Sequence, residues 1–225
     1  MHMKISNFDA NNPPGELDAL ACKFRTDKGS AGAHGHGYTR WYAPLFAPLK
    51  MEPISILELG VSGGASLKLW EAYFPNANII GLDINEKMLS MSRPRVEVMM
   101  VNTGVPLRLQ QFVDTPRQFD VIIDDGSHVL EDVVLALKYL WPTVKRGGLY
   151  IIEDLGCSSF PTTPIITAED GAAAKLRWGK HVCSGWVDFH EQHDSESLMI
   201  YPSQNRHGDT PDSGGQSLVV FRKKS

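Results

Sequence analysis

Residues 119–128 constrain the fold more than any other part of the chain. The segment Phe119-Asp-Val-Ile-Ile-Asp-Asp-Gly-Ser-His128 runs from apolar and β-branched residues directly into two carboxylates, a glycine, a serine and a histidine. An apolar run of this kind is typical of a buried parallel strand. Ligands of open α/β sheets bind just beyond the carboxyl ends of such strands. The segment therefore predicts an α/β fold with a binding site where this strand ends.

A second segment of the same design follows at Gly148-Leu-Tyr-Ile-Ile-Glu-Asp-Leu155. If the two strands are neighbours, they lie roughly 4.8 Å apart, and their terminal carboxylates converge. Carboxylate oxygens suit Mg²⁺, Mn²⁺ or Ca²⁺ rather than zinc. Side chains of adjacent residues on a strand point to opposite faces of the sheet. Glu153 and Asp154 can therefore share a cation only if the strand ends at these two residues. We predict that the metal ligands are Asp125, Glu153 and Asp154; the alternative is that these acids cap helices or bond to turn backbone.

The turn after the predicted strand Ser55-Ile-Leu-Glu-Leu-Gly60 is rich in glycine and leads into a helix. A dinucleotide loop would need glycine at position 62, where this chain has serine. The pattern Glu-x-Gly-x-Ser-x-Gly fits the methyltransferase form E-x-G-x-G-x-G with one replacement, and a nicotinamide dinucleotide is the alternative ligand. We therefore predict that S-adenosylmethionine (SAM) binds here, with contacts from Glu58, Gly60, Ser62, Gly64 and Ser66.

Polar residues after the next strands complete the predicted SAM site. Asp83 ends the strand Asn78-Ile-Ile-Gly-Leu-Asp83 and is expected to accept hydrogen bonds from the ribose hydroxyls; the alternative is an ordinary turn acid. Asn102 follows the predicted strand Val96–Val101 and is expected to contact the adenine edge. Asp124 is assigned to the SAM side of the same crevice.

His128 lies at the mouth of this crevice, in the same segment as Asp125. A hydroxyl must lose its proton to accept a methyl group, and a bound cation lowers the pKa of that hydroxyl so that a neutral histidine can take the proton. We therefore predict that His128 is the general base. The alternative is a residue beside a helix N-terminus without a chemical role.

Composition and length exclude several other classes. At 225 residues the chain can form one well-buried domain, with a helical, substrate-covering segment expected at residues 1–50 and a methyltransferase domain at residues 51–225. A net charge of -4 gives no electrostatic reason to expect nucleic acid. Three cysteines without CxxC spacing argue against a disulfide framework or a zinc site. Since neither a signal peptide nor a long apolar run is found, we expect no membrane association and a cytoplasmic location.

The two acidic segments carry a family resemblance. Val121-Ile-Ile-Asp-Asp-Gly-Ser-His128 together with Tyr150-Ile-Ile-Glu-Asp154 resembles the metal-dependent sugar O-methyltransferases of macrolide antibiotic biosynthesis, the mycinamicin and demethylmacrocin type. Thr26-Asp-Lys-Gly29 and His36-Gly-Tyr38 are similar to the opening of that family. The resemblance implies a Rossmann-like class I methyltransferase, with a mostly parallel seven-stranded sheet, helices on both faces and a terminal antiparallel strand pair.

The resemblance also implies a reaction and its participants. SAM would methylate a hydroxyl of a deoxysugar on a secondary metabolite, so the partner is a small glycosylated acceptor, covered by residues 26–42 and 156–167. Mg²⁺ or Mn²⁺ would be held by the three acids named above, with His128 as the base. The chain departs from the family after the third strand, where Val101-Asn-Thr103 replaces the usual Gly-Asp-Gln. The sequence leaves open whether the chain forms a homo-oligomer.

Three alternative functions remain. A cephalosporin hydroxylase-like enzyme has a similar arrangement of acids and histidine. A catechol-type phenol O-methyltransferase would share SAM and the cation, but its base is more often a lysine, and none lies in the crevice motifs. A non-catalytic SAM-binding module is the third.

Overall fold

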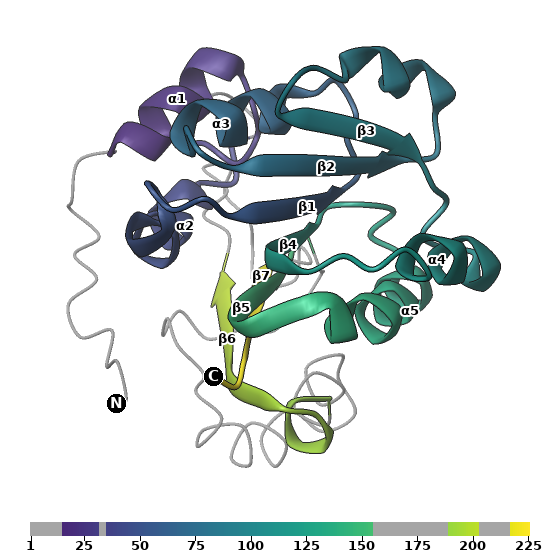
Figure 1. The fold of residues 1–225 in the computed structure, drawn as a ribbon. Coiled ribbons are helices and arrows are strands. Elements are labelled where there is room, and N and C mark those ends of the chain that lie inside the picture. The colour runs from purple at the N-terminus through teal and green to yellow at the C-terminus, as the bar shows by residue number, and fades with distance from the viewer. Residues whose placement is uncertain (1–14, 32–34, 155–188, 203–216) are drawn as a thin grey trace.

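The computed structural model describes residues 15–31, 35–154, 189–202 and 217–225. They form a seven-stranded sheet of order β3-β2-β1-β4-β5-β7-β6 (Figure 1). The predicted fold class is therefore confirmed. The segment over residues 156–167, predicted to cover the acceptor, lies outside the described residues.

The strands fall into a parallel set and an antiparallel pair. The order of the parallel strands reverses between β1 and β4, which creates the crevice where ligands of open α/β sheets bind. The parallel strands are β1 (Ser55–Leu59), β2 (Asn78–Asp83), β3 (Val96–Met100), β4 (Phe119–Asp124) and β5 (Val144–Ile152). The antiparallel strands are β6 (Ser195–Pro202) and β7 (Ser217–Lys223), and β7 pairs with β5.

Strand β5 begins earlier than the sequence predicts. The predicted segment starts at Gly148, whereas β5 starts at Val144; Gly147 and Gly148 therefore lie inside the strand, where Gly147 has a φ of 74° and the pairing with β4 shifts register. The glycines therefore form an irregularity within β5, a common role for glycine inside a strand.

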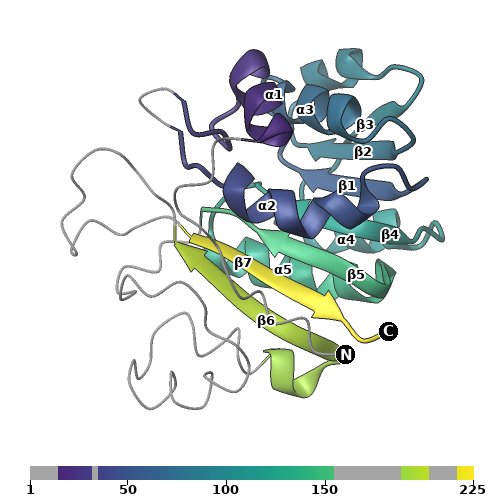
Figure 2. The same ribbon diagram turned by 90° about the vertical axis from the view of Figure 1, so that its left-hand side faces the viewer.

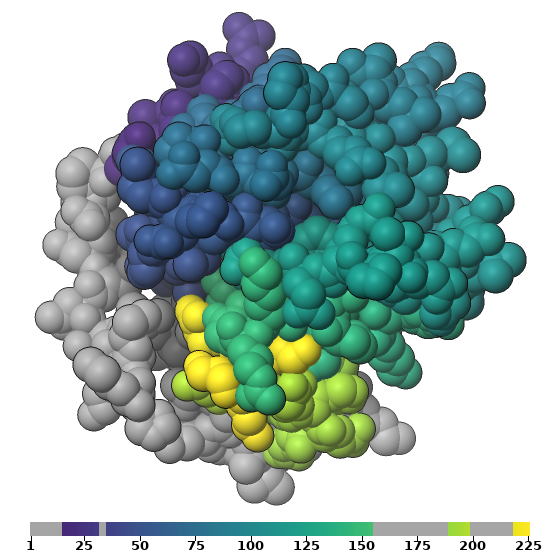
Figure 3. All heavy atoms as spheres, in the orientation of Figure 1, coloured from purple at the N-terminus to yellow at the C-terminus, as the bar shows by residue number. Residues whose placement is uncertain are grey.

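Helices cover both faces of the sheet (Figure 2). One face carries α1 (Glu16–Phe24), α2 (Thr39–Phe46) and α3 (Ala65–Tyr73), and the other carries α4 (Pro106–Val113) and α5 (Leu130–Leu140). The 3₁₀ turns are η1 (Ala47–Leu49), η2 (Glu86–Met91) and η3 (Trp141–Thr143). In the space-filling view, the N-terminal helices and the neighbouring sheet form a continuous surface (Figure 3). In the part of the chain that is described, no helix combines the length and apolar character needed to cross a membrane.

Strand alternation decides which face the acidic residues reach. Ile56, Ile123 and Ile151 are buried in the core that also contains residues of α1, α2 and α3. Because side chains on one face recur every second residue, Glu58, Asp125 and Glu153 follow them on that same face. The acids are therefore directed towards the N-terminal helices rather than towards α4 and α5.

The turn after β1 lies in close contact with the chain after β4. Gly60 has a φ of 85°, and a Cβ added there would lie 2.1 Å from the backbone carbonyl oxygen of Asp125. Ser62 has a φ of 48°, in the left-handed region that favours glycine. The backbone thus explains why the related pattern has glycine at this position.

The close contact at Gly60 predicts a large effect of a single methyl group. Gly60→Ala is expected to lower the free energy of unfolding by about 2 kcal/mol or more, because the methyl group meets the Asp125 carbonyl and the backbone conformation is strained. Gly63→Ala is the matched control, since nothing lies within 4 Å of its added Cβ. Urea denaturation measures both variants; equal midpoints would contradict the packing described here.

Candidate active site

The three acids predicted as metal ligands meet at the ends of β4 and β5. The amide of Glu153 donates a hydrogen bond to the carbonyl of Asp124 at 2.9 Å, which holds the two strand ends together. Asp154 has a φ of 56°, so the regular alternation of side chains stops there. This backbone conformation explains how the adjacent Glu153 and Asp154 both reach one site.

Lys28, from the segment between α1 and α2, lies between two of these acids. Its Nζ atom is 2.5 Å from Oδ2 of Asp125 and 2.9 Å from Oε2 of Glu153. The lysine side chain is 1% exposed. Burial lowers the pKa of Lys28, but the carboxylates of Asp125 and Glu153 outweigh it, and the pKa lies well above the ordinary lysine value. The ammonium is therefore charged at neutral pH.

This finding corrects one expectation from the sequence. A lysine does lie among the crevice acids, although the crevice motifs themselves contain none. It does not favour a catechol-type mechanism, because a lysine with a raised pKa and two carboxylate partners is a poor proton acceptor.

Aromatic side chains from the same N-terminal region hold the other carboxylate oxygens. The hydroxyl of Tyr42 donates to Oε1 of Glu153, and the hydroxyl of Tyr38 donates to Oδ1 of Asp154 at 2.6 Å. His36 stacks on Tyr38, and its Nε2 atom lies 3.8 Å from Oδ2 of Asp154. Each of the acids thus has a partner in residues 26–42, the segment predicted to cover the site.

Burial governs the electrostatics of the carboxylates. It raises the pKa of Asp125 and raises that of Glu153 well above its ordinary value, while the charge of Lys28 acts in the opposite direction on both. A positive charge entering the site would therefore favour the ionised form of these acids.

His128 lies at the edge of this cluster. Its Nε2 atom is 4.0 Å from Oδ1 of Asp125, and its side chain is 41% exposed. The residue has a φ of 56°, in the left-handed region, which histidine adopts more often than most residues other than glycine, asparagine and aspartate. It thus lies next to the acids and is open to a substrate.

The donor set fits a hard divalent cation. One oxygen each of Asp125 and Asp154 and one ring nitrogen of His128 lie within 4.8 Å of one another. Oxygen ligands suit Mg²⁺ and Mn²⁺, and Mg²⁺ usually keeps several waters. Both oxygens of Glu153 accept hydrogen bonds from Lys28 and Tyr42, so its role as a direct ligand stays a prediction.

Glu58 and Ser66, both predicted to contact SAM, lie beneath the glycine loop. Glu58 is fully buried and accepts hydrogen bonds from Ser66 Oγ at 2.9 Å and from Trp70 Nε1 at 3.0 Å. Burial raises the pKa of Glu58 to about 7, and the charge of Lys28 lowers it in part. In this structure the pair supports the loop from inside; contact of Glu58 with SAM stays a prediction.

Asp83 is bonded to the loop that it was predicted to complement. Its Oδ2 atom accepts hydrogen bonds from the amides of Val61 at 2.9 Å and Ser62 at 3.0 Å. Its other oxygen accepts from the amide of Asn85 at 2.8 Å. Asp83 therefore fixes the glycine loop against the end of β2.

The residue after Asp83 is Ile84, whose side chain is 70% exposed and offers an apolar surface beside the loop.

Three further residues were predicted to contact SAM, and that contact stays a prediction. The side chain of Asn102 accepts a hydrogen bond from the Gly104 amide at 3.0 Å, in an exposed turn. Gly64 has a φ of 71° at the start of α3. Asp124 points to the α5 face, where Tyr150 donates to it at 3.2 Å, and burial raises its pKa to about 7.

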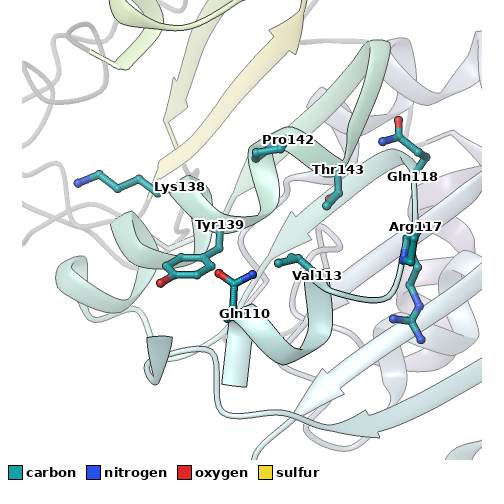
Figure 4. Close-up of a pocket in the computed structure, with 9 residues that line it drawn as sticks. Gln110, Val113, Arg117, Gln118, Lys138, Tyr139, Pro142 and Thr143 are labelled. Carbon is teal, nitrogen blue, oxygen red and sulfur yellow. The ribbon is translucent and has the colours of Figure 1, made fainter. Parts of the chain in front are cut away.

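A hollow of about 670 Å³ lies elsewhere on the molecule (Figure 4). Arg117 and Gln118 come just before β4, and Pro142 and Thr143 just before β5, so the hollow lies at the amino ends of these strands. No carboxylate lines it. The chemistry therefore favours the acid cluster at the carboxyl ends as the functional site.

The sequence analysis missed Lys28, Tyr38 and Tyr42 as site residues. Two of them lie in the motifs Thr26-Asp-Lys-Gly29 and His36-Gly-Tyr38, which carried the family resemblance but were given no role. The available signal was electrostatic: acids gathered at two strand ends need a positive partner, and a buried charge is almost always paired.

Comparisons with known proteins find a methyltransferase domain in this chain. Residues 57–152 match the family model described as a methyltransferase domain. The chain is 35% identical over 164 residues to 8-demethyl-8-alpha-L-rhamnosyl tetracenomycin-C 2'-O-methyltransferase from Streptomyces olivaceus, covering 70% of this chain and 42% of the relative. It is 33% identical over 154 residues to demethylmacrocin O-methyltransferase from Streptomyces fradiae, covering 65% of this chain and 38% of the relative.

A solved structure has the same fold. The MycE methyltransferase of the mycinamycin biosynthetic pathway, in complex with Mg and SAH, superimposes with a TM-score of 0.69 and 23% identity, over 93% of this chain and 55% of that one. The chain spans about two fifths of the length of the two curated relatives above. These matches confirm the resemblance: the chain contains a methyltransferase domain with the class I fold and is similar in sequence to the two O-methyltransferases named above.

Proposed function

We propose that this chain is a SAM-dependent O-methyltransferase that methylates a hydroxyl of a glycosylated small molecule with the help of a divalent cation. The observation that carries the proposal is the contact between the two halves of the site. The glycine turn packs against the backbone of Asp125, so a donor held by the turn lies next to the acids and His128. The related proteins named above are methyltransferases of tetracenomycin-type and macrolide-type substrates, which supports a glycosylated acceptor.

The donor side is assigned to the glycine loop and the ends of β1 to β3. Gly60, Ser62 and Gly64 provide backbone that a ligand can approach closely, and Asp83 offers carboxylate lone pairs to ribose hydroxyls. SAM supplies an electrophilic methyl group on a sulfonium sulfur. Its transfer to oxygen forms a C–O bond, breaks the C–S bond and leaves S-adenosylhomocysteine.

The acceptor side is assigned to the acids and His128. Asp125 and Asp154 would hold Mg²⁺ or Mn²⁺, which lowers the pKa of a hydroxyl bound to it. His128 takes the proton of that hydroxyl as the oxygen attacks the methyl carbon. Asp125 Oδ1 lies 4.0 Å from the imidazole, so the proposed base and the proposed cation ligand are neighbours. Residues 1–50 are proposed to cover the acceptor, and residues 51–225 to form the catalytic domain.

Calorimetry with SAM, carried out with Mg²⁺ and again with EDTA, tests donor and cation before an acceptor is chosen. A cephalosporin hydroxylase-like enzyme would need oxygen and a reductant, and a non-catalytic module would bind SAM without transferring its methyl group. Absence of SAM binding under both conditions would contradict the proposal.

His128 is expected to be needed for transfer and not for donor binding. His128→Gln should lower kcat by at least about 100-fold, the usual contribution of a general base, and should change the Kd of SAM by less than about threefold, because the ring lies outside the glycine loop. Mass spectrometry of a demethylmacrocin-type acceptor measures the product, and calorimetry measures SAM. Undiminished transfer would show that the base lies elsewhere.

Asp154 is expected to bind the cation. Asp154→Asn should raise the Kd of Mn²⁺ by at least about 10-fold, since a charged oxygen ligand is lost. Asp114→Asn is the matched control, because Asp114 is an exposed acid bonded to Gln110 on α4. Electron paramagnetic resonance of free Mn²⁺ gives both constants. The same Kd in both variants would remove Asp154 from the cation site.

A further inference from the structure

Lys28 joins two of the acids across neighbouring strands. Its ammonium contacts Oδ2 of Asp125 and Oε2 of Glu153, and these atoms belong to the ends of β4 and β5. The remaining oxygen of Glu153 is held by Tyr42, whereas Oδ1 of Asp125 faces His128. Lys28 therefore fixes which oxygen of Asp125 is directed towards the candidate cation site.

The backbone around Lys28 is held in place independently of the acids. Asp18 of α1 accepts hydrogen bonds from the Ser30 amide at 2.8 Å, the Ser30 hydroxyl at 2.6 Å and the Thr39 hydroxyl at 2.5 Å. The Thr39 amide also donates to the Lys28 carbonyl at 3.0 Å. The ammonium is thus delivered by a backbone segment that is anchored to α1.

Lys28 and the three acids that meet here carry a net negative charge when all four are ionised. Asp125, Glu153 and Asp154 contribute three negative charges when ionised, and Lys28 contributes one positive charge, so two negative charges remain. That remainder equals the charge of one divalent cation. We propose that Lys28 is a positioning residue that serves as a fixed counter-charge, and that it sets the affinity of the site for a single divalent cation. This inference rests on the cation site proposed above.

Removal of the ammonium tests this role directly. In Lys28→Met, the cluster keeps three carboxylates and loses their internal partner. The melting temperature without metal should fall by roughly 10 °C, because buried carboxylates are left unpaired. The Kd of Mn²⁺ should fall at least about 10-fold, because a positive charge next to the cation has been removed. Mn²⁺ should also raise the melting temperature more than in the wild type.

A double variant separates the charge from the packing. In Lys28→Met with Glu153→Gln, one positive and one negative charge are removed together, so the remainder of two is restored. Glutamine keeps an acceptor for Tyr42. We expect a Kd for Mn²⁺ within about threefold of the wild type. The single variant leaves both Asp125 and Glu153 without Lys28, whereas this double variant leaves only Asp125 without it, so the double variant serves as the second test if the single variant does not fold.

Lys145→Met is the matched control. Lys145 also pairs with a carboxylate, Asp120 at 2.7 Å, but at the amino end of β5. Its replacement should leave the Kd of Mn²⁺ unchanged. All four proteins are compared as the full chain without SAM, by electron paramagnetic resonance of free Mn²⁺ and by thermal unfolding with and without Mn²⁺.

The outcomes distinguish the two proposals. Tighter Mn²⁺ binding in the single variant and wild-type binding in the double variant support the role of Lys28. If the wild type binds Mn²⁺ and Lys28→Met binds it equally well or more weakly, the proposed role of Lys28 is wrong. The proposed cation site is not affected by that result. The role of Lys28 is also wrong if the double variant loses binding. If neither the wild type nor any variant binds Mn²⁺, both the cation site and the role of Lys28 fall.

Discussion

The ion pairs of Lys28 with Asp125 and Glu153 are the interaction on which the candidate site depends. Two acids at the ends of neighbouring parallel strands repel each other in a buried environment, and burial already raises the pKa of both. The ammonium between them, at 2.5 and 2.9 Å, offsets that repulsion. A buried pair of this kind adds little net stability but is costly to break. Its main effect is to fix geometry, since it joins the N-terminal segment to the ends of the sheet.

The donor and acceptor sides are assembled by contacts between backbone and carboxylates. Asp83 fixes the turn after β1 through two amides, and Gly60 allows that turn to approach the carbonyl of Asp125. The same strand reversal that creates the crevice thus brings the glycine loop and the acid cluster together. The backbone at His128 and Asp154 is in the left-handed conformation. The two side chains therefore point in directions that a regular strand would not allow. Such conformations are found most often where function requires them.

The sequence predicted the sheet and its acids because these depend on local patterns. Apolar runs such as residues 119–124 identify buried strands, and the order of strands and helices identifies the fold class. The convergence of Asp125 and Asp154 followed from the pairing of β4 with β5. Lys28 could not be assigned to the site from such local patterns. It lies almost a hundred residues before Asp125 in the sequence, and only the tertiary fold brings the two together. The early start of β5 was missed because Gly147 and Gly148 favour the end of an element, whereas here they form an irregularity inside the strand, between Val144 and Leu149, which both pair with β4.

The position of β7 between β5 and β6 has a consequence for the order in which the sheet can form. Strand β6 comes first in the chain, but its ladder is with β7, and β7 in turn pairs with β5. During synthesis, residues 195–202 leave the ribosome before their partner exists, and they have no place in the sheet until residues 217–223 arrive. The parallel strands, in contrast, can pair as each is made. The edge of the sheet at β6 is therefore completed last, by two strands that join as a unit.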